Sequence, residues 1–533
     1  MSLSTSNLKI KFLGIIPVFK DETGVLNPQE IVALSGLLTF SGKSIENVLK
    51  EITDKGENLN DKIKNILRKS SLIGHASMST TPVLSFSYEA SKFLDSGLTG
   101  IVFASAIMAS GRRTDTTIND IVYPSSISEN EKASEIYRIA SEKNINILNW
   151  LLGQGVQKDE ASKILQYGIY GTGIIQLPIE SIVSLKREYE VEKEWMPEEI
   201  GMVLKEVGKE LKKFGVDLLY ATRVVAPRNT YPFPSIFRDP KEISLVRDIA
   251  KKKKSKEDFQ IVSSDFVVTP ALKKRLDGLK KEIEEAVKDR TTFKDKWMGL
   301  LEKRQQIARD YGLSANIKMF SSVAWRVWGD KKRHRTVPMV VESVYYCAER
   351  AVKVFNKYKT SIKDKKVSPK MIDALNSVFS IPPSVRNNKE FLCGYLGRAL
   401  DSLEVYSRLI SMGVRERDAI FVIPRGLRID VVQDYNLFNL IAGYYPLRTC
   451  STVEEELRRL SLKEVIAIKN LLKKKKLGWL AEHIAPKCFA AGFCLENKCC
   501  GAIKALTKDY DEQFHKEMMK DLESKFQTTL GEL

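Results

Sequence analysis

A short basic turn is the part of the sequence where residue types and spacing most directly indicate chemistry. Arg333, His334 and Arg335 are consecutive. Arginine presents a rigid set of N–H donors that matches phosphate oxygens, and a histidine between two arginines can stack on or donate to a flat heterocycle. The triplet therefore predicts a site for an anionic ligand with a ring system. A solvated basic turn is the ordinary alternative for such a triplet on its own.

Further residues follow the triplet in a fixed order. Ser343 lies eight positions after Arg335 and is preceded by Glu342. Farther along come a Gly-Val break, a Val-Ile-Pro turn, a Leu-Arg pair and a glutamate, at Gly413-Val414, Val422-Ile423-Pro424, Leu447-Arg448 and Glu456. Taken together, these anchors resemble the signature of the flavin-dependent thymidylate synthases. The resemblance covers about residues 315–480 well and about residues 60–215 weakly, by motif order.

The resemblance implies roles for the residues of the basic turn and those just after it. Arg333, His334 and Arg335 would contact the flavin and its phosphates. Ser343 would bind the nucleotide phosphate region, and Glu342 would assist there and at the cofactor.

Other matching positions lie farther from the turn. Arg448 would sit on the uracil edge, favour the anionic form of the ring and act as the catalytic residue. Asn436 and Asn439 lie near the flavin-contacting asparagines of the family, and Arg428 would replace a nucleotide-binding arginine. His75, within Gly-His-Ala-Ser, looks like the family's Gly-His-x-Ser stretch and is expected at the cofactor.

By the same resemblance, the chain is expected to be an FAD-dependent methyltransferase that converts dUMP to dTMP by reductive methylation. Methylenetetrahydrofolate and NADPH would be its co-substrates. An arginine at the pyrimidine edge suits this reaction because it stabilises negative charge spread over the ring, while the flavin carries the redox step. Tyr345 stands in place of a family arginine and Pro338 in place of a serine. These departures leave the identity of the pyrimidine nucleotide open.

The sequence also contains an internal similarity. Residues 149–161 and 408–419 each read as the end of an amphipathic helix, a Gly-Val break and a new helix opened by polar and acidic residues. Prolines crowd around residues 227–240, as is typical of a linker. We expect two tandem copies of one domain: a degenerate thymidylate synthase-like domain at 1–235, and a better-kept domain with a Cys-rich tail at 236–533.

Local patterns predict a mixed fold. Apolar residues at helical spacing predict helices over residues 270–311 and 457–480, and short apolar runs at 8–19 and 419–423 predict strands. The mixture predicts an α+β class, with a mixed or antiparallel sheet and long helices in each copy. In the first copy, Gly111-Arg112-Arg113 is expected at the place of the basic triplet.

The charge balance agrees with anionic ligands. The chain has 85 basic and 67 acidic residues, a net charge of +18. A lysine-rich solvated surface is the alternative, and basic runs without interleaved aromatic residues argue against a nucleic-acid groove. Two other functions stay open: a basic nucleic-acid-binding protein, and a catalytically inactive scaffold derived from the same fold.

Location and assembly are predicted from negative signals and analogy. No secretory signal opens the chain, and its most apolar stretch, residues 97–111, is too short to span a bilayer. We therefore expect a cytoplasmic protein with small-molecule substrates and no membrane partner, and a homodimer that forms a pseudo-tetramer as the tetrameric family suggests. Four clustered cysteines lack clean zinc spacing, so no metal is expected, although a zinc site with His483 is an alternative. They are Cys488, Cys494, Cys499 and Cys500.

Overall fold

The computed structural model describes most of the chain as two compact units. The described residues are 3–21, 24–70, 77–99, 101, 103–111, 114–221, 235–253, 255 and 257–531. The first unit comprises residues 1–244, 324–333 and 341–429. The second comprises residues 245–323, 334–340 and 430–533.

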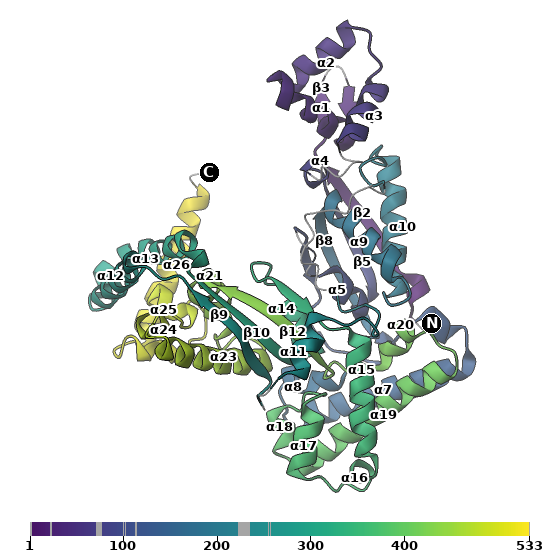
Figure 1. The fold of residues 1–533 in the computed structure, drawn as a ribbon, viewed down its shortest axis with the longest axis vertical. Helices are drawn as coiled ribbons and strands as arrows, with labels where there is room; N and C mark the ends of the chain where they lie inside the picture. Colours follow the sequence, from purple (N-terminus) through teal and green to yellow (C-terminus); the bar gives the residue numbers. More distant parts are fainter. Residues whose placement is uncertain are drawn as a thin grey trace. The chain divides into compact units, whose positions relative to one another are not determined.

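A four-stranded antiparallel sheet organises the amino-terminal part of the first unit. Its strand order is β2-β5-β8-β6, with β2 at Lys9–Ile16, β5 at Val83–Ser91, β8 at Tyr170–Pro178 and β6 at Ser105–Met108. Leu84, Phe86 and Tyr88 alternate along β5 and are buried, as expected for a strand with one face in the core. Two helices, α9 (Ile179–Glu192) and α10 (Glu198–Lys213), pack against β8 and β2 respectively (Figure 1).

Three helices near the amino terminus form a small cluster of their own. They are α1 (Pro28–Ser41), α2 (Ile45–Asp54) and α3 (Leu59–Lys69). Each begins at a polar residue whose side chain accepts a backbone N–H, namely Asn27, Ser44 and Asn58. Leu34, Val48 and Ile52 form the core of this cluster.

A run of elements in the first unit recurs farther along the chain at a constant spacing. Asn144 and Ser402, which lie 258 positions apart, are hydrogen-bonded to each other at 3.0 Å. The same spacing relates five consecutive pairs: α6 (Ser125–Ser128) and α18 (Pro383–Arg386), α7 (Glu131–Gly153) and α19 (Lys389–Ser411), α8 (Lys158–Ala161) and α20 (Glu416–Ala419), η4 (Ser162–Ile164) and η6 (Ile420–Val422), β8 and β12 (Arg428–Asn436). The long helices α7 and α19 pack against each other.

Contacts between the two runs are reciprocal. The Ser126 hydroxyl donates to the Asp418 carboxylate at 2.6 Å, and Ser384, at the equivalent position, donates to Glu160. Backbone bonds repeat the pattern, from Gly168 N to Phe421 O at 3.2 Å and from Gly426 N to Lys163 O at 2.7 Å. Reciprocal contacts of this kind are typical of a two-fold relation between two similar surfaces.

The second unit contains a sheet with the same strand order. It reads β9-β10-β12-β11, with β9 at Phe259–Phe266, β10 at Ala315–Ala324 and β11 at Met339–Val341. Its helices include α12 (Pro270–Ala286), α13 (Arg290–Asp310), α21 (Leu437–Ile441), α22 (Tyr444–Arg448) and α23 (Glu455–Lys474). Val246, Phe320 and Val432 form part of its core.

The remaining elements connect or extend these layers. In the first unit they are β1 (Leu3–Ser4), β3 (Phe19–Asp21), β4 (Gly24–Leu26), α4 (Ser77–Thr80), α5 (Lys92–Leu98), β7 (Val122–Tyr123), α14 (Trp325–Lys331), α15 (Val344–Lys357), α16 (Lys359–Lys363) and α17 (Pro369–Asn376). In the second unit they are α11 (Leu245–Lys251), α24 (Gly478–Ala481), α25 (Lys487–Ala491) and α26 (Glu512–Gly531).

The α+β class and the antiparallel sheets predicted from the sequence are confirmed. The helical pattern over 270–311 forms the hairpin α12–α13, and the pattern over 457–480 forms α23. The strand predicted at 419–423 is wrong, because these residues end α20 and form the helical turn η6. Their buried apolar side chains do not by themselves distinguish a strand from a helical turn.

The predicted division at 235/236 stays a prediction. It describes a repeat along the sequence, whereas the first compact unit takes residues from both sides of that point and the second takes residues only from 245 onward. Gly111 follows β6, whereas the basic turn precedes β11, so this glycine does not have the topological position expected for it. Arg112 and Arg113 lie outside the described residues. Within the described part of the chain, no helix combines the length and the apolar character needed to cross a membrane.

Candidate functional site

The second unit fixes the basic turn with a buried asparagine. Asn439, on α21, donates from Nδ2 to the Thr336 carbonyl at 3.0 Å and accepts the Thr336 hydroxyl at 2.9 Å. Asn439 is fully buried. Because both ends of one amide are used on one residue, Thr336 and the preceding His334–Arg335 backbone are tied to the start of α21.

A second asparagine orients the first. Asn436 caps α21, and its Oδ1 accepts the backbone N–H of Asn439 at 3.0 Å and the Asn439 side-chain amide at 2.9 Å. An asparagine at this position satisfies an N–H that the helix cannot. The two asparagines predicted near the flavin thus form one hydrogen-bonded chain that ends on the basic turn.

The histidine of the turn faces an aromatic helix start. The rings of His334 and Tyr444 meet edge to face, with centroids 4.9 Å apart. Tyr444 begins α22 and Arg448 ends it, and residues four apart on a helix lie on the same face. Arg448 therefore projects from the helix face that His334 contacts. Within the second unit, the fold brings His334 and the helix of Arg448 together.

Three tyrosine rings pack against one another beside His334, and we call them the tyrosine wall. Tyr435, Tyr444 and Tyr445 have ring centroids about 5 Å apart, at 4.9, 4.9 and 5.1 Å. The Tyr445 hydroxyl donates to the buried Glu464 at 3.2 Å, and Ser321 donates to the same carboxylate at 2.7 Å. Burial raises the pKa values of Tyr435 and Tyr445 well above the ordinary value. These two phenols therefore stay neutral.

The two guanidinium groups of this region differ in exposure. Arg335 is exposed, although partial burial lowers its pKa, whereas Arg448 is half-buried. A guanidinium with reduced hydration interacts more strongly with a bound anion than one in bulk water does. The region supplies the guanidinium groups of Arg335 and Arg448 and the imidazole of His334, which contacts Tyr444. This set of donors suits a flat anionic ligand.

Other predicted site residues belong to the first unit and have protein partners. Glu342 is buried and accepts the Ser244 hydroxyl at 2.7 Å and the Ser343 N–H at 2.8 Å. The Ser343 hydroxyl donates to the Arg238 carbonyl at 2.7 Å. Ligand binding by Ser343 would require its hydroxyl to leave this carbonyl.

Two further predicted residues, Arg428 and Arg333, also belong to the first unit. The Arg428 side chain is buried and donates to the Asn376 carbonyl and, at 3.3 Å, to the Asn376 side chain. Arg333 is exposed at the end of this unit's segment 324–333. His75 lies outside the described residues.

Two site neighbours were not anticipated from the sequence. The sequence motifs assign no role to Thr336, which directly follows the triplet, or to Tyr444. A signal for Tyr444 exists, because the pair Tyr444-Tyr445 directly precedes the Leu-Arg anchor on a helix of five residues. Thr336 has no comparable signal, since its partner Asn439 lies 103 positions away.

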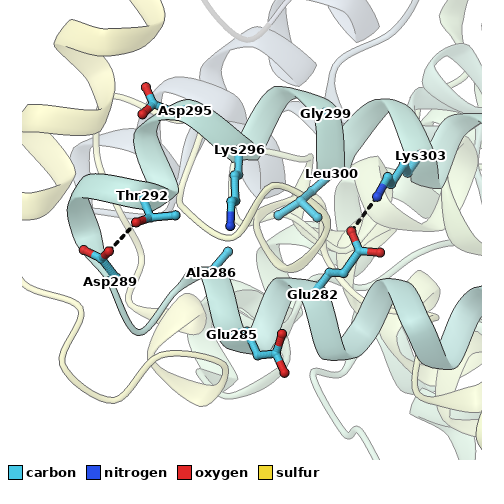
Figure 2. Close-up of a pocket in the computed structure, with 10 residues that line it drawn as sticks. All are labelled: Glu282, Glu285, Ala286, Asp289, Thr292, Asp295, Lys296, Gly299, Leu300 and Lys303. Carbon is cyan, nitrogen blue, oxygen red and sulfur yellow. Dashed lines mark hydrogen bonds and ion pairs between the residues drawn. The ribbon is translucent and has the colours of Figure 1, made fainter.

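A groove between α12 and α13 does not include any predicted site residue. Its volume is about 520 Å³, and its lining is mostly charged (Figure 2). Two of its contacts are local, from Thr292 to Asp289 and from Lys303 to Glu282 at 2.6 Å. Acidic and basic side chains on the two helices thus pair across a solvated hairpin, and we assign no ligand to it.

The cysteine tail belongs to the second unit. Burial raises the pKa of the Cys488 thiol to about 12 and that of Cys494 to about 11, so these two thiols are protonated at neutral pH. His483 is buried beside Arg304, which donates to its carbonyl at 3.4 Å, and burial lowers its pKa to about 4. Among the described residues, no group of three His, Cys, Asp or Glu side chains is arranged to hold a metal ion.

Known proteins resemble the part of the chain that carries this site. Residues 271–471 match the family described as thymidylate synthase complementing protein. The flavin-dependent thymidylate synthase of Pyrococcus abyssi is 26% identical over 130 residues, which are 23% of this chain and 50% of that protein. The enzyme of Pyrococcus furiosus is 25% identical over 146 residues, 26% of this chain and 57% of that protein.

Two further matches cover a shorter and a longer part of the chain. The flavin-dependent thymidylate synthase of Aeropyrum pernix is 32% identical over 83 residues, 16% of this chain and 26% of that protein. A solved UMP/dUMP methylase of Streptomyces cacaoi, bound with 5-Br dUMP, has 12% identity and a TM-score of 0.30, and the match covers 42% of this chain and 100% of that one. The chain spans about half the length of the Pyrococcus relatives it matches. Through residues 271–471, this chain is similar to the flavin-dependent thymidylate synthases.

Proposed function

We propose that the chain is a flavin-dependent thymidylate synthase that methylates dUMP reductively, with methylenetetrahydrofolate as the carbon donor, FAD as the cofactor and NADPH as the reductant. One observation carries the proposal. Within the matched residues, His334 contacts Tyr444 at the start of the short helix that ends in Arg448, so the basic turn and the helix of Arg448, which are far apart in sequence, lie together in one unit.

The donor set of the second unit fits a flavin. A flavin cofactor is a flat ring system with anionic phosphates, and it supplies hydride when reduced. His334 would lie against the ring system, and Arg335 would hold negative charge. Asn439 and Asn436 keep the turn in place through Thr336, so the imidazole and the guanidinium are oriented before the ligand arrives.

Arg448 has the role of the group that acts on the nucleotide. Carbon 5 of uracil becomes electron-rich when negative charge spreads over the ring, and a positioned guanidinium on the ring edge stabilises that charge. Tyr435 and Tyr445, whose pKa values are raised by burial, add no charge near this helix. We therefore assign Arg448 to the pyrimidine edge and His334–Arg335 to the cofactor.

We also propose that the chain is a tandem duplication. Two sheets of equal strand order and a run of elements repeated at 258 positions support this reading. On this reading, the reciprocal contacts between α6–α8 and α18–α20 correspond to an interface between two copies. A homodimer of such chains would contain four copies of the fold.

Two measurements on the purified full chain test the proposed activity. The chain incubated with FAD and passed through a desalting column should keep a visible flavin band, and with dUMP, methylenetetrahydrofolate and NADPH it should release tritium from C5-labelled dUMP. A colourless chain without tritium release would contradict the proposal and favour an inactive scaffold. A colourless chain whose DNA affinity falls steeply with salt would favour nucleic-acid binding.

A further inference from the structure

A buried carboxylate in the first unit is surrounded by an excess of cations. Asp95, on α5, accepts the Tyr88 hydroxyl at 2.6 Å, and the Lys92 ammonium lies 3.9 Å from its other oxygen. The Asp95 side chain is 13% exposed and that of Lys92 is 7% exposed. One carboxylate, already shared with a phenol, is thus the nearest negative charge to Lys92.

Two more cations are buried around the same group. Lys332, just after α14, is 2% exposed and donates to the Ser96 carbonyl. Arg425 is 2% exposed, and its Nε donates to the Gln166 carbonyl at 3.1 Å. Each of these two cations therefore donates a hydrogen bond to a neutral carbonyl and not to a carboxylate. Lys92 likewise donates to the Ala109 carbonyl at 2.8 Å.

The cations affect one another electrostatically. The pKa of Lys92 is lowered to about 8, first by burial and then by Arg425, Arg326 and Arg333, against the opposing effect of Asp95. Burial and Arg333 lower the pKa of Lys332 to about 7. The pKa of Arg425 is lowered to about 10, and burial is the largest cause. Buried like charges are costly unless a counter-charge joins them.

Donors are also in excess over acceptors near Arg425. Its guanidinium stacks over the Tyr167 ring at 4.9 Å, and the Trp325 ring lies 4.5 Å from the same tyrosine. Among the described residues, Arg425 Nη2, Trp325 Nε1 and Gln166 Nε2 are buried without an acceptor. Buried donors in native proteins are nearly always satisfied, so three in one neighbourhood indicate that an acceptor-rich group belongs there.

Glycine at position 111 keeps space beside this guanidinium. A Cβ at Gly111 would lie 3.2 Å from Arg425 Nη1, which is close for a side-chain contact. Gly111 thus lets backbone, and not a side chain, approach the charged end of Arg425.

We propose that Lys92, Lys332 and Arg425 bind a phosphoryl group, as free phosphate or as the phosphate of a nucleotide. A phosphate dianion brings several acceptor oxygens and two negative charges, which match the unpaired donors and the surplus cations. None of these three residues was assigned a role by the family resemblance. The site lies wholly within the first unit, and it does not depend on the proposed methylation.

Calorimetry on the full chain tests this site. Sodium phosphate, uridine 5′-monophosphate and uridine are titrated at pH 7 and constant ionic strength. We expect phosphate to bind and uridine alone not to bind. Tighter binding of the monophosphate than of phosphate would identify a nucleotide as the ligand, and equal binding of the two would identify free phosphate. No binding of phosphate or of the monophosphate to the wild-type chain would overturn the site.

Variants tie the binding to the named residues. Arg425→Gln and Lys92→Gln should each weaken phosphate binding about tenfold or more, since each removes a charge-assisted hydrogen bond, whereas Lys92→Arg should retain most of it. Arg304→Gln is the matched control, because Arg304 is another buried arginine, in the second unit, whose pKa burial lowers to about 10. Near-ultraviolet circular dichroism checks that each variant is folded.

The variant outcomes separate the site from other phosphate binding. If folded Lys92→Gln binds phosphate as tightly as the wild type, or if Arg304→Gln weakens binding as much as Arg425→Gln does, the assignment fails. If Arg425→Gln does not fold, the contrast between Lys92→Gln and Lys92→Arg still decides. A chain that binds phosphate here but releases no tritium from dUMP would sustain this site and contradict the proposed function alone.

Discussion

At the scale of single residues, one amide holds the basic turn. Asn439 uses its N–H donor and its oxygen on Thr336, and Asn436 in turn accepts from Asn439. Asn439 itself is buried and fully engaged, so its loss leaves its partners without these bonds. The geometry of His334 and Arg335 thus depends on a residue that has no charge and no reactive group.

Replacing Asn439 should measure this dependence. We expect Asn439→Ala to lower the free energy of unfolding by about 1–3 kcal/mol, because the part-buried bonds to Thr336 and Asn436 are lost and a buried side chain is truncated. Asn436→Asp is the control, since an aspartate keeps the acceptor that caps α21 and should cost less. Urea unfolding at 25 °C compares the variants. Equal stability of Asn439→Ala and the wild type would refute the role of this amide.

At the scale of elements, the turns after α7 and α19 have the same geometry. Gly155 and Gly413 follow these helices with φ of 81° and 83°, a left-handed conformation that favours glycine. The sequence predicts both breaks because Gly-Val interrupts an apolar helical pattern. It predicts the helices α12, α13 and α23 for the same reason, since helical periodicity is local information. It fails at η6, where a short buried run has no period to read.

Two glycines of the α19 region separate backbone strain from packing. A Cβ at Gly413 meets no atom within 4 Å, yet its φ is +83°, whereas Gly397 lies inside α19 and also has nothing within 4 Å. Gly413→Ala should therefore lower stability by about 1–2 kcal/mol through the backbone alone. Gly397→Ala should raise stability by about 0.5–1 kcal/mol. Thermal unfolding of both variants checks the signs, and stabilisation by Gly413→Ala would be inconsistent with the left-handed turn.

At the scale of the whole molecule, long-range packing decides which residues share a unit. The sequence places the basic triplet and Arg448 in one family signature, and His334 does contact the helix of Arg448. It does not reveal that Arg333 and His334 belong to different compact units. The cluster of Lys92, Asp95 and Arg425 could not be predicted from the sequence either, because its members come from distant segments without a shared motif. Non-local contacts leave no periodic trace in the sequence.

The pH dependence of folding follows from a buried acid of the first unit. Glu199 accepts the Ser91 N–H at 2.7 Å, and burial raises its pKa to about 7. The folded chain therefore binds a proton that the unfolded chain, with a pKa near 4.5, releases earlier. This contribution to stability is complete below about pH 4.5 and is lost as the pH rises to about 7.

Glu199→Gln isolates this contribution. In the wild type, the free energy of unfolding should fall by at most about 1.4 kcal/mol per pH unit between about pH 4.5 and 7 because of Glu199, and this fall should be absent from the variant. Above that range the variant should be more stable relative to the wild type than it is at low pH. Chemical unfolding at several pH values gives both curves. Parallel curves across the whole range would show that Glu199 has an ordinary pKa in the folded chain.

The most direct test of the account is tritium release from C5-labelled dUMP by Arg448→Ala, assayed beside Arg408→Ala, which alters an exposed arginine of α19. If Arg448 stabilises the charged pyrimidine in front of His334, its loss should reduce the rate about 100-fold or more without changing the unfolding free energy, and Arg408→Ala should behave as the wild type. Release by Arg448→Ala at the wild-type rate would contradict the site.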